Sequence, residues 1–386
     1  HRDLHYPLRR QRQMCIRDRW SSLFTTAINL GENGFLVSEK LASSIERDSD
    51  RLKKISQTSE YFLPDGINLK YKQLVTNKAY AETLKKIATD GIRDFYKGEI
   101  AEKIASAMKD NGGLISLNDL KNYEPVWRNP LQSEYKGSKI ITMGPPSSGG
   151  VHIIQMLNIL KNYDLAAIGH NSSDYINLLT EVMKHAYADR SKYLGDPDFY
   201  DVPINKLTSK LYAESIVNKI ELGASSNSSS ILPGMYMDYE SDETTHFSVA
   251  DKYGNVVSST YTLNSAFGSG VVIQDTGILM NNEMDDFSAA PGIPNQFGLL
   301  GAKANEIVPF KRPLSSMTPT IVMKNNELFF TTGSPGGSRI ISAVLQSILN
   351  IIDFEMNLEE ATYAQRIHHQ WQPLSLIHIS EPTRLR

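Results

Sequence analysis

Thr244 could act as a nucleophile if the chain were cut immediately before it. A threonine at a chain N-terminus combines a hydroxyl that attacks with a free α-amine that takes up the proton. Gly336 and Gly337 lie in a Gly-rich turn before a predicted helix, where backbone N–H groups can bind a developing oxyanion. A Thr-rich segment alone is usually only a strand. Neither feature is sufficient alone, but together with the motifs described below they indicate a self-processing enzyme that transfers an acyl group from an amide.

Cleavage of the Glu243–Thr244 bond would activate this threonine, because an internal residue has no free amine to act as base. The expected route is attack of the Thr244 hydroxyl on the Glu243 carbonyl, an N-to-O acyl shift and hydrolysis of the ester. Residues 223–243 precede the bond and are rich in Ser, Gly and acidic residues. This composition predicts a flexible, exposed connector, although an ordinary interdomain linker has the same composition.

The elements that must position Thr244 are predicted to be two hairpins and a helix. Residues 245–249 and 256–261 form one hairpin, and residues 320–323 and 328–331 form another. The Gly-rich turn then leads into residues 339–354, whose apolar side chains recur at helical spacing. The chain therefore mixes strands and helices in its second half.

The first half is predicted to be mainly helical. Apolar faces recur over residues 84–88 and 100–108, and Asn111 begins a helix stop. Ser116 is the predicted N-cap of a short helix, and residues 175–193 form a longer amphipathic helix. We assign these apolar faces to core packing.

Length, charge and cysteine content exclude several classes of protein. The chain has 386 residues, with 40 Lys and Arg against 43 Asp and Glu, and a net charge of −3. This balance gives no electrostatic case for nucleic-acid binding, and no apolar run is long enough to span a bilayer. Cys15 is the only cysteine, so neither an internal disulfide nor a Cys-based metal site is expected.

Both ends of the chain differ in character from the middle. Residues 1–19 hold six Arg and two Asp, and residues 374–386 hold two Arg and one Glu. We interpret both as non-native, adapter-like extensions rather than as basic binding arms.

Six segments in fixed order carry a family resemblance. They read TTHFSVAD, TYTLNSAFGSG, GILMNNEMDDFSAAPG, KRPLSSMTPT, TGSPGGSRI and RIHHQW. Upstream, FYKGEIAEKIASAMKDNGGL, MGPPSSGGVHI and YADRSKYLGDPDF extend the match. From about Trp20 to about Pro373 the chain resembles bacterial members of the γ-glutamyltranspeptidase family.

The resemblance implies an α+β fold, the four-layer αββα sandwich of N-terminal-nucleophile hydrolases. It implies cleavage into residues 20–243, a partial and mostly helical large subunit, and residues 244–373, a C-terminally truncated catalytic small subunit, paired as a heterodimer. The implied activity is γ-glutamyl transfer and hydrolysis on glutathione and other γ-glutamyl donors, with amino acids, peptides or water as acceptors. No cofactor, nucleic acid or membrane span is expected, and the implied location is periplasmic or secreted.

The resemblance also assigns a role to each residue that matches a family motif. These roles are nucleophile for Thr244, hydrogen-bonding assistance for Thr262, oxyanion hole for Gly336 and Gly337, α-amine ligands for Asn264, Glu283 and Asp286, α-carboxylate ligands for Ser315 and Ser316, and pocket lid for Pro291, Asn295 and Phe297.

Each of these residues also has a simpler interpretation. Without the motifs, Thr262 would be an ordinary strand residue, Glu283 and Asp286 solvated loop acids like Asp285, and the two serines a turn. A phosphate loop at the Gly-rich turn is disfavoured, because the Gly-Lys-Ser/Thr ending is missing.

The chain departs from the family pattern in two places. The family's arginine that clamps the α-carboxylate has no matching segment, and its loss is expected to weaken donor binding. Phe297 stands where bacterial relatives often carry tyrosine, so its ring can cover the site without a hydroxyl hydrogen bond.

His246, His368 and His369 lack carboxylate or Cys partners at ligand spacing, which favours packing and hydrogen bonding over a metal site. Two other functions stay open. A β-lactam or glutaryl acylase would share the fold, but a glutaryl group offers no α-amine to Asn264, Glu283 and Asp286. An unprocessed, inactive fragment is the second alternative.

Overall fold

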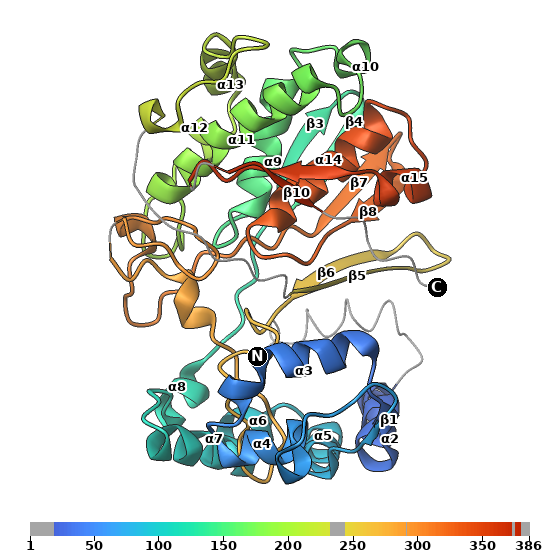
Figure 1. Ribbon diagram of the computed structural model, residues 1–386, viewed down its shortest axis with the longest axis vertical. Helices are drawn as coiled ribbons and strands as arrows, with labels where there is room; N and C mark the ends of the chain where they lie inside the picture. Colours follow the sequence, from blue (N-terminus) through green and yellow to red (C-terminus); the bar gives the residue numbers. More distant parts are fainter. Residues whose placement is uncertain (1–18, 232–243, 291, 373–374, 380–386) are drawn as a thin grey trace. The chain divides into compact units, whose positions relative to one another are not determined.

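A computed structural model of the chain describes residues 19–231, 244–290, 292–372 and 375–379 (Figure 1). Glu243, Pro291 and most of the predicted connector lie outside these residues. The chain divides into two compact units, one made of His1–Trp127 and Ala266–Asn282, the other of Arg128–Ser265 and Glu283–Arg386. Ala266–Asn282 returns to the first unit, so neither unit is continuous in sequence. The predicted division into two subunits at residues 243 and 244 concerns cleavage and stays a prediction.

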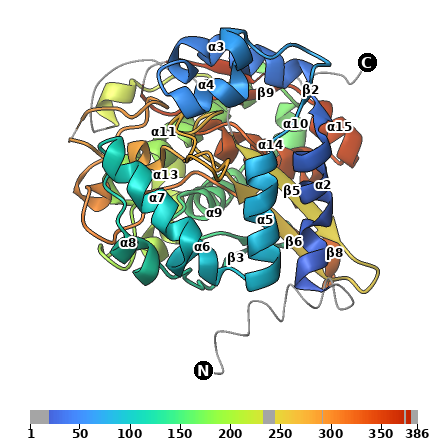
Figure 2. The same cartoon turned by 90° about the horizontal axis from the view of Figure 1, so that it is seen from below.

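The first unit is built from helices. Helices α2 (Thr25–Asn33) and α5 (Lys78–Asp90) lie side by side (Figure 2). Helices α6 (Arg93–Lys97), α7 (Glu99–Asp110) and α8 (Leu117–Asn122) follow, and a short two-stranded ladder pairs β1 (Phe35–Leu36) with β2 (Leu74–Val75). Ser116 caps α8 and forms a reciprocal capping box with Asp119, which confirms the predicted helix start.

The returning segment is held in the first unit by buried side-chain hydrogen bonds. Thr58 Oγ1 donates to the carbonyl of Gly270 at 2.6 Å, and Thr83 Oγ1 donates to the carbonyl of Thr276 at 2.8 Å. Both threonines lie on helices, α4 (Ser56–Phe62) and α5. A buried carbonyl left without such a partner would be costly, so these contacts fix the segment in place.

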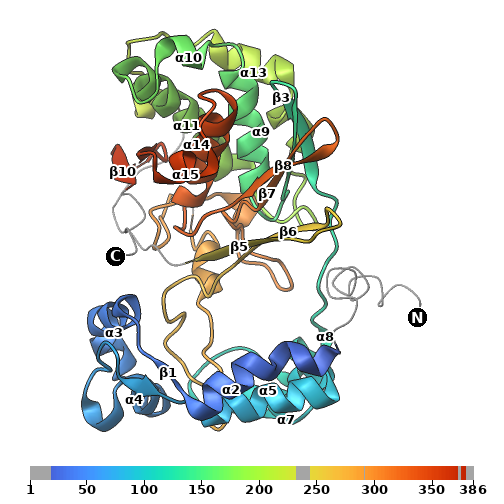
Figure 3. The same cartoon turned by 90° about the vertical axis from the view of Figure 1, so that its right-hand side faces the viewer.

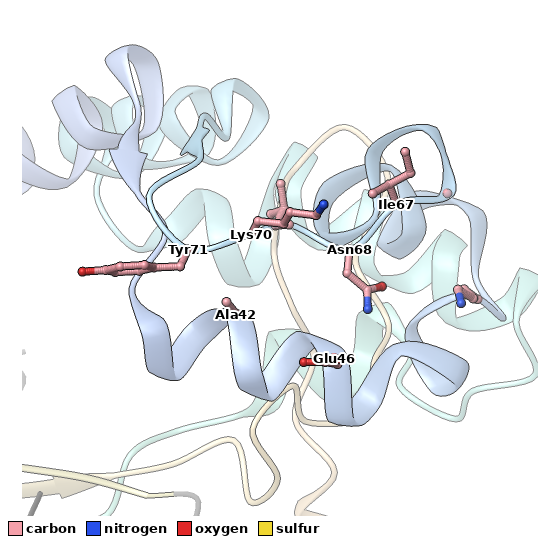
Figure 4. Close-up of a pocket in the computed structure, with 9 residues that line it drawn as sticks. Ala42, Glu46, Ile67, Asn68, Lys70 and Tyr71 are labelled. Atoms are coloured by element: carbon pink, nitrogen blue, oxygen red, sulfur yellow. The ribbon is translucent and has the colours of Figure 1, made fainter.

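A surface pocket of about 560 Å³ also lies in the first unit (Figure 4). Helix α3 (Glu39–Leu52) contributes Ala42 and Glu46, and the loop of residues 66–71 supplies much of the remaining wall. The pocket contains none of the site residues predicted from the sequence.

The second unit contains a four-stranded antiparallel sheet. Its strands, in spatial order, are β3 (Leu131–Tyr135), β4 (Ser138–Thr142), β7 (Thr320–Lys324) and β8 (Glu327–Thr332). Ile140 of β4 faces Val322 of β7 in register, and neither side chain reaches solvent. The predicted hairpin near residue 325 is therefore confirmed as β7 and β8.

Three long helices pack with this sheet around one hydrophobic core (Figure 3). They are α9 (Gly149–Leu160), α11 (Ser173–Tyr193) and α14 (Arg339–Ile352). Helix α9 is buried along its whole length, and α14 presents an apolar face of Ile and Leu residues to the core. The shorter helices of the unit are α10 (Leu165–Ile168), α12 (Ile204–Leu207), α13 (Lys210–Val217) and α15 (Leu358–Tyr363).

A separate hairpin carries Thr244 at its start. Strand β5 (Thr245–Ala250) pairs with β6 (Val256–Tyr261), as the sequence predicted. A second two-stranded ladder joins β9 (Arg366–His368) to β10 (Ile377–Ile379). Together with the helices these elements confirm the predicted α+β class. Among the described residues, no helix is both long and apolar enough to cross a membrane.

The prediction of a flexible, exposed connector is wrong at Ser226 and Ser228, while Gly223, Ala224 and Ser225 are exposed as predicted. Lys184 Nζ donates to the carbonyl of Ser226 at 2.8 Å, and Trp371 Nε1 donates to the carbonyl of Ser228 at 2.9 Å. Ser228 is only 1% exposed. Composition predicted a solvated segment, but tertiary hydrogen bonds hold this part in place. The rest of the connector, residues 232–243, lies outside the described residues.

Candidate active site

The register of the β5–β6 hairpin brings two predicted site residues to one end. The end pair of the hairpin is Thr245 of β5 with Tyr261 of β6. Thr244 comes directly before Thr245 and Thr262 comes directly after Tyr261, so both residues lie at this end. Beyond β6 the backbone turns sharply, since Asn264 has a φ of 74° and its N–H donates to Thr262 Oγ1 at 2.8 Å. The asparagine is almost completely buried.

His246 connects this hairpin to the Gly-rich turn. Its Nδ1 lies 2.8 Å from Thr260 Oγ1, and its Nε2 lies 3.1 Å from Ser248 Oγ. The imidazole packs against Gly333 so closely that any side chain at Gly333 would overlap it. Burial lowers the pKa of His246, so a neutral ring is favoured. The histidine therefore acts in packing and hydrogen bonding, as the sequence predicted.

The Gly-rich turn leaves backbone donors uncommitted at the start of α14. Gly336 and Gly337 have φ values of 122° and 52°, which side chains rarely adopt. Their carbonyls accept from the N–H groups of Arg339 and Ile340. Their own N–H groups donate to no acceptor within the described residues, and no side chain caps the helix. Such orphan donors at a helix N-terminus suit an anion.

The acidic turn, η5 (Glu283–Asp286), contains carboxyl groups whose pKa values are raised. Burial raises the pKa of Glu283 to about 7. The pKa of Asp286 rises to about 8, first through burial and then through the nearby charge of Glu283, while Arg190 opposes the shift. Two carboxyl groups that are costly to ionise together would be stabilised by a bound cation.

Asp285 differs from its predicted role as a solvated loop acid. Its Oδ2 accepts a hydrogen bond from the N–H of Gln296 at 3.0 Å, and burial raises its pKa. Gln296 in turn accepts from Ser265 Oγ at 3.0 Å through its Oε1. The carboxylate therefore anchors the segment that was predicted to be the lid.

Ser315 and Ser316 both use their hydroxyl oxygens as acceptors. Ser315 Oγ accepts from the N–H of Met317 at 3.0 Å, and Ser316 Oγ accepts from Arg190 Nη2 at 3.3 Å. Neither hydroxyl donates to an acceptor elsewhere in the described part of the chain. Because each hydroxyl has one proton to give, the pair is suited to donate two hydrogen bonds to a carboxylate.

Asn305 joins the acidic turn to the serine pair. Its Nδ2 donates to the carbonyl of Asp286 at 2.7 Å, and its Oδ1 accepts from the N–H of Leu314 at 3.0 Å. The side chain is 4% exposed. One buried amide thus fixes the backbone on both sides of the candidate site.

The predicted lid residues pack against the other parts of the site. Asn295 Nδ2 donates to Asp286 Oδ1 at 3.3 Å, and Asn295 Oδ1 accepts from the N–H of Phe297. The Phe297 ring lies against Gly337. Gln370 Nε2 holds the Phe297 carbonyl at 2.9 Å. Pro291, the remaining predicted lid residue, lies outside the described residues.

Comparisons with known proteins identify the family. The family described as gamma-glutamyltranspeptidase matches residues 16–383. The glutathione hydrolase proenzyme of Escherichia coli (strain K12) is 49% identical over 348 residues, which are 90% of this chain and 60% of that protein. The chain belongs to the γ-glutamyltranspeptidase family. It spans about three fifths of the length of the curated relatives it matches.

Two solved structures support the same fold. The γ-glutamyltranspeptidase of Helicobacter pylori aligns with a TM-score of 0.55 at 42% identity, over 56% of this chain and 63% of that one. A cephalosporin acylase from Bacillus halodurans aligns with a TM-score of 0.75 at 26% identity, over 92% and 62%. The predicted N-terminal-nucleophile hydrolase fold is confirmed.

Two residues that contact the candidate site were not predicted from the sequence, Arg190 and Asn305. Arg190 lies on α11, and the apolar face of this helix predicted only core packing. The sequence signal that could have revealed Arg190 is the number of charged residues on this otherwise apolar helix. Four of them are buried in the structure, Glu181, Lys184, Asp189 and Arg190, and buried charges are uncommon. Asn305 ends the short 3₁₀ helix η6 (Lys303–Asn305), and no local pattern reveals its role.

The remaining histidines behave as predicted. His368 is fully buried and lies 2.7 Å from Ser342 Oγ through Nδ1 and 3.0 Å from Gln370 Oε1 through Nε2. His369 Nδ1 accepts from the N–H of Trp371. Among the described residues, no three His, Cys, Asp or Glu side chains are grouped to hold a metal ion.

Proposed function

We propose that the chain is the core of a γ-glutamyl acyltransferase and hydrolase that acts on glutathione and other γ-glutamyl compounds. The observation that carries the proposal is the pairing of opposite ligand sets in one unit. Ser315 and Ser316 offer two hydroxyl protons, and Glu283 and Asp286 offer carboxyl groups that a cation would stabilise. The head of a γ-glutamyl donor carries one α-carboxylate and one α-ammonium, which match these two sets.

The same pairing favours this substrate class over acyl groups without an amine. A glutaryl donor has no ammonium group, so its binding would bring no cation to the buried carboxyl groups of Glu283 and Asp286 and would not offset the cost of burying them. The name of the E. coli relative supports the same choice, since that protein is called a glutathione hydrolase proenzyme. A β-lactam or glutaryl acylase remains the alternative that shares the fold.

Self-cleavage is the first chemical step of the proposal. The Thr244 hydroxyl attacks the carbonyl carbon of Glu243 and forms a tetrahedral oxyanion. The Glu243–Thr244 C–N bond then breaks as its nitrogen takes up the proton released by the hydroxyl, which leaves Glu243 as an ester on Thr244 Oγ and frees the Thr244 amine. Water hydrolyses the ester, so the two products end in the Glu243 carboxylate and begin with the Thr244 α-amine.

Turnover uses the same hydroxyl with its new base. The α-amine of Thr244 takes the hydroxyl proton as Oγ attacks the γ-amide carbon of the donor. The oxyanion is proposed to be stabilised by the N–H groups of Gly336 and Gly337, and their lack of other acceptors at the helix start supports this role. The proton passes to the leaving amine, and a γ-glutamyl ester remains on Thr244. An acceptor amine or water then attacks this ester and restores the free hydroxyl.

Thr262 and Asn264 are proposed to assist at the nucleophile and at the donor amine. Both lie at the Thr244 end of the hairpin, which supports these roles. Asn295 and Phe297 are proposed to cover the donor. After cleavage the two chains are proposed to stay together as a heterodimer, in a periplasmic or secreted protein.

The test is the intact mass of the purified chain, followed by N-terminal sequencing of any smaller product. We expect a new chain that begins Thr-Thr-His-Phe-Ser, and loss of that chain in Thr244→Ala. Thr245→Ala is the matched control, because Thr245 is an exposed strand residue with no proposed chemical role. Cleavage that survives in Thr244→Ala would falsify the mechanism, and an uncut parent chain would support the alternative of an inactive fragment.

A further inference from the structure

Arg190 is a buried cation whose place in the second unit is not explained by core packing. Its side chain is 4% exposed, and its Nε donates to Ser148 Oγ at 3.1 Å while Nη2 donates to Ser316 Oγ at 3.3 Å. Within the described residues no carboxylate lies at ion-pairing distance from the guanidinium. Asp286 acts on it only from longer range. A buried charge without a close counter-ion is costly, so it calls for a functional explanation.

The direction of these hydrogen bonds determines where the Ser316 proton can point. A guanidinium has five donors and no acceptor, so Ser316 Oγ must accept from Arg190. The hydroxyl proton of Ser316 is then directed away from Arg190. A serine without this partner could rotate and serve as an acceptor, which a carboxylate cannot satisfy.

The second partner of Arg190 fixes the backbone beside Ser316. Ser148 Oγ accepts from Arg190 and donates to the carbonyl of Ser315 at 2.9 Å. The N–H of Ser148 donates to the same carbonyl, and the N–H of Ser315 donates to the carbonyl of Pro146. Arg190 thus acts on both the side chain and the backbone of the serine pair.

We propose that Arg190 is a positioning residue that holds the Ser316 hydroxyl as a hydrogen-bond donor to the α-carboxylate of the γ-glutamyl ligand. The proposal rests on the proposed function, because it assumes that Ser315 and Ser316 bind that carboxylate. A carboxylate bound by these serines would also bring a negative charge close to the unpaired guanidinium. Such an attraction is stronger than at the protein surface, because Arg190 and Ser316 are both buried.

Two small ligands separate this role from a general structural one. L-Glutamate carries the α-carboxylate, the α-ammonium and the γ-carboxyl group. 4-Aminobutyrate keeps the amine and the γ-carboxyl group but lacks the α-carboxylate. We expect Arg190→Met to weaken L-glutamate binding to the purified chain by on the order of 10-fold, measured by titration calorimetry. Binding of 4-aminobutyrate should not change, because the missing group is the one that Arg190 serves.

A double-mutant cycle with Ser316→Ala tests whether Arg190 acts through Ser316. In the Ser316→Ala background, Arg190→Met should cost far less L-glutamate affinity than in the parent chain. Arg128→Met is the matched control, because Arg128 pairs with Asp196 and Asp198 and contacts neither serine. Arg190→Lys covers the case in which Arg190→Met does not fold. It keeps the charge but not the two-point geometry, so a smaller loss with the same ligand preference is expected.

Equal weakening of both ligands, or additive losses in the cycle, would overturn the proposal and leave Arg190 as a structural residue. Failure of the parent chain to bind L-glutamate would also overturn it. The chain could also bind L-glutamate in a way that depends on Arg190, yet neither cleave itself nor turn over a donor. That result would contradict the proposed function but not the role of Arg190.

Discussion

The ring of Phe297 fills the space where a side chain at Gly337 would lie. A Cβ added at Gly337 would stand 2.7 Å from Phe297 Cδ1 and 2.8 Å from Cε1. The Phe297 backbone is fixed from the other side, because Gln370 joins its carbonyl to the hydroxyl of Ser338. The predicted lid and the predicted oxyanion turn are therefore packed against each other directly.

Gly337→Ala is expected to reduce donor turnover by about 100-fold or more, the size of loss seen when one oxyanion donor is removed. The alanine meets two obstacles, the Phe297 ring and a φ of 52°. Adding Phe297→Ala to Gly337→Ala removes only the clash and should restore part of the activity. Turnover is measured with a chromogenic γ-glutamyl donor. No recovery in the double variant would assign the whole loss to the backbone. Normal activity of Gly337→Ala would contradict the prediction, because the turn would then keep its geometry with a side chain present.

Donor KM is expected to fall as the pH rises from below about 7 to about 8. Glu283 and Asp286 have pKa values raised to about 7 and about 8, so the free site is partly protonated in this range. An ammonium binds the ionised carboxylates better, which gives the direction of the change. Glu283→Gln should raise KM and remove the part of the dependence near pH 7. The donor amine titrates in the same way whether the parent chain or Glu283→Gln is assayed. The ratio of the two KM values therefore reports only the titration of groups on the protein. A ratio independent of pH would contradict the assignment.

Stability should change with pH in the opposite sense. A carboxyl group whose pKa is raised on folding stabilises the folded chain below its unfolded pKa, and this contribution is lost as pH rises through the folded value. For Glu283 the window runs from about 4.5 to about 7. Glu283→Gln should therefore raise Tm relative to the parent chain more at pH 8 than at pH 5, measured by thermal unfolding. A larger gain at the lower pH would show that the carboxylate is stabilising.

The sequence predicted the elements around the site because hairpins and amphipathic helices leave local patterns. The residues of β5 and β6 have a strand-like pattern on either side of a turn. Helix α14 repeats its apolar residues at helical spacing and ends at Ile352, two residues before the predicted end. The family motifs then assigned roles to individual residues of the candidate site, and these roles stay predictions. Tertiary contacts overrode the local pattern at the connector, where a buried lysine and Trp371 hold residues that composition marked as exposed.

Contacts between distant residues could not be predicted in this way. Arg190 and Ser316 are 126 positions apart, and no periodicity links them. Asn305 acts through two backbone groups, so its role depends on how two loops approach each other in space. The packing of Phe297 on Gly337 is of the same kind. Such relationships become visible only when the chain is folded.

Asn305→Ala should lower the free energy of unfolding by about 1–3 kcal/mol, because it leaves the carbonyl of Asp286 and the N–H of Leu314 without partners. Asn305→Asp keeps an acceptor for Leu314 but places a carboxylate against the Asp286 carbonyl, so it should destabilise the chain as well. Urea unfolding measures both effects. Asn118→Ala, which removes an exposed helix amide, is the control and should stay within about 0.5 kcal/mol. A neutral Asn305→Ala would show that water replaces the bridge.

The buried pair of Lys184 and Glu181 offers a prediction about both stability and self-cleavage. Nζ and Oε1 are 2.7 Å apart, and the side chains are only 2% and 3% exposed. Lys184 also donates to the Ser226 carbonyl and to Ser225 Oγ, and Glu181 accepts from Ser226. The pair therefore anchors the segment that leads toward Thr244.

Lys184→Met should cost about 3–5 kcal/mol, because it leaves Glu181 buried without a counter-ion, whereas adding Glu181→Leu should recover much of that loss. Both variants lose the anchor at Ser226, so both should release the Thr244 chain more slowly than the parent. Urea unfolding and a time course of the cleaved product measure the two effects separately. Lys192→Met, an exposed lysine on the same helix, is the control. If the double variant regains stability and also cleaves at the parental rate, the anchor has no part in maturation, because stability alone would then set the rate.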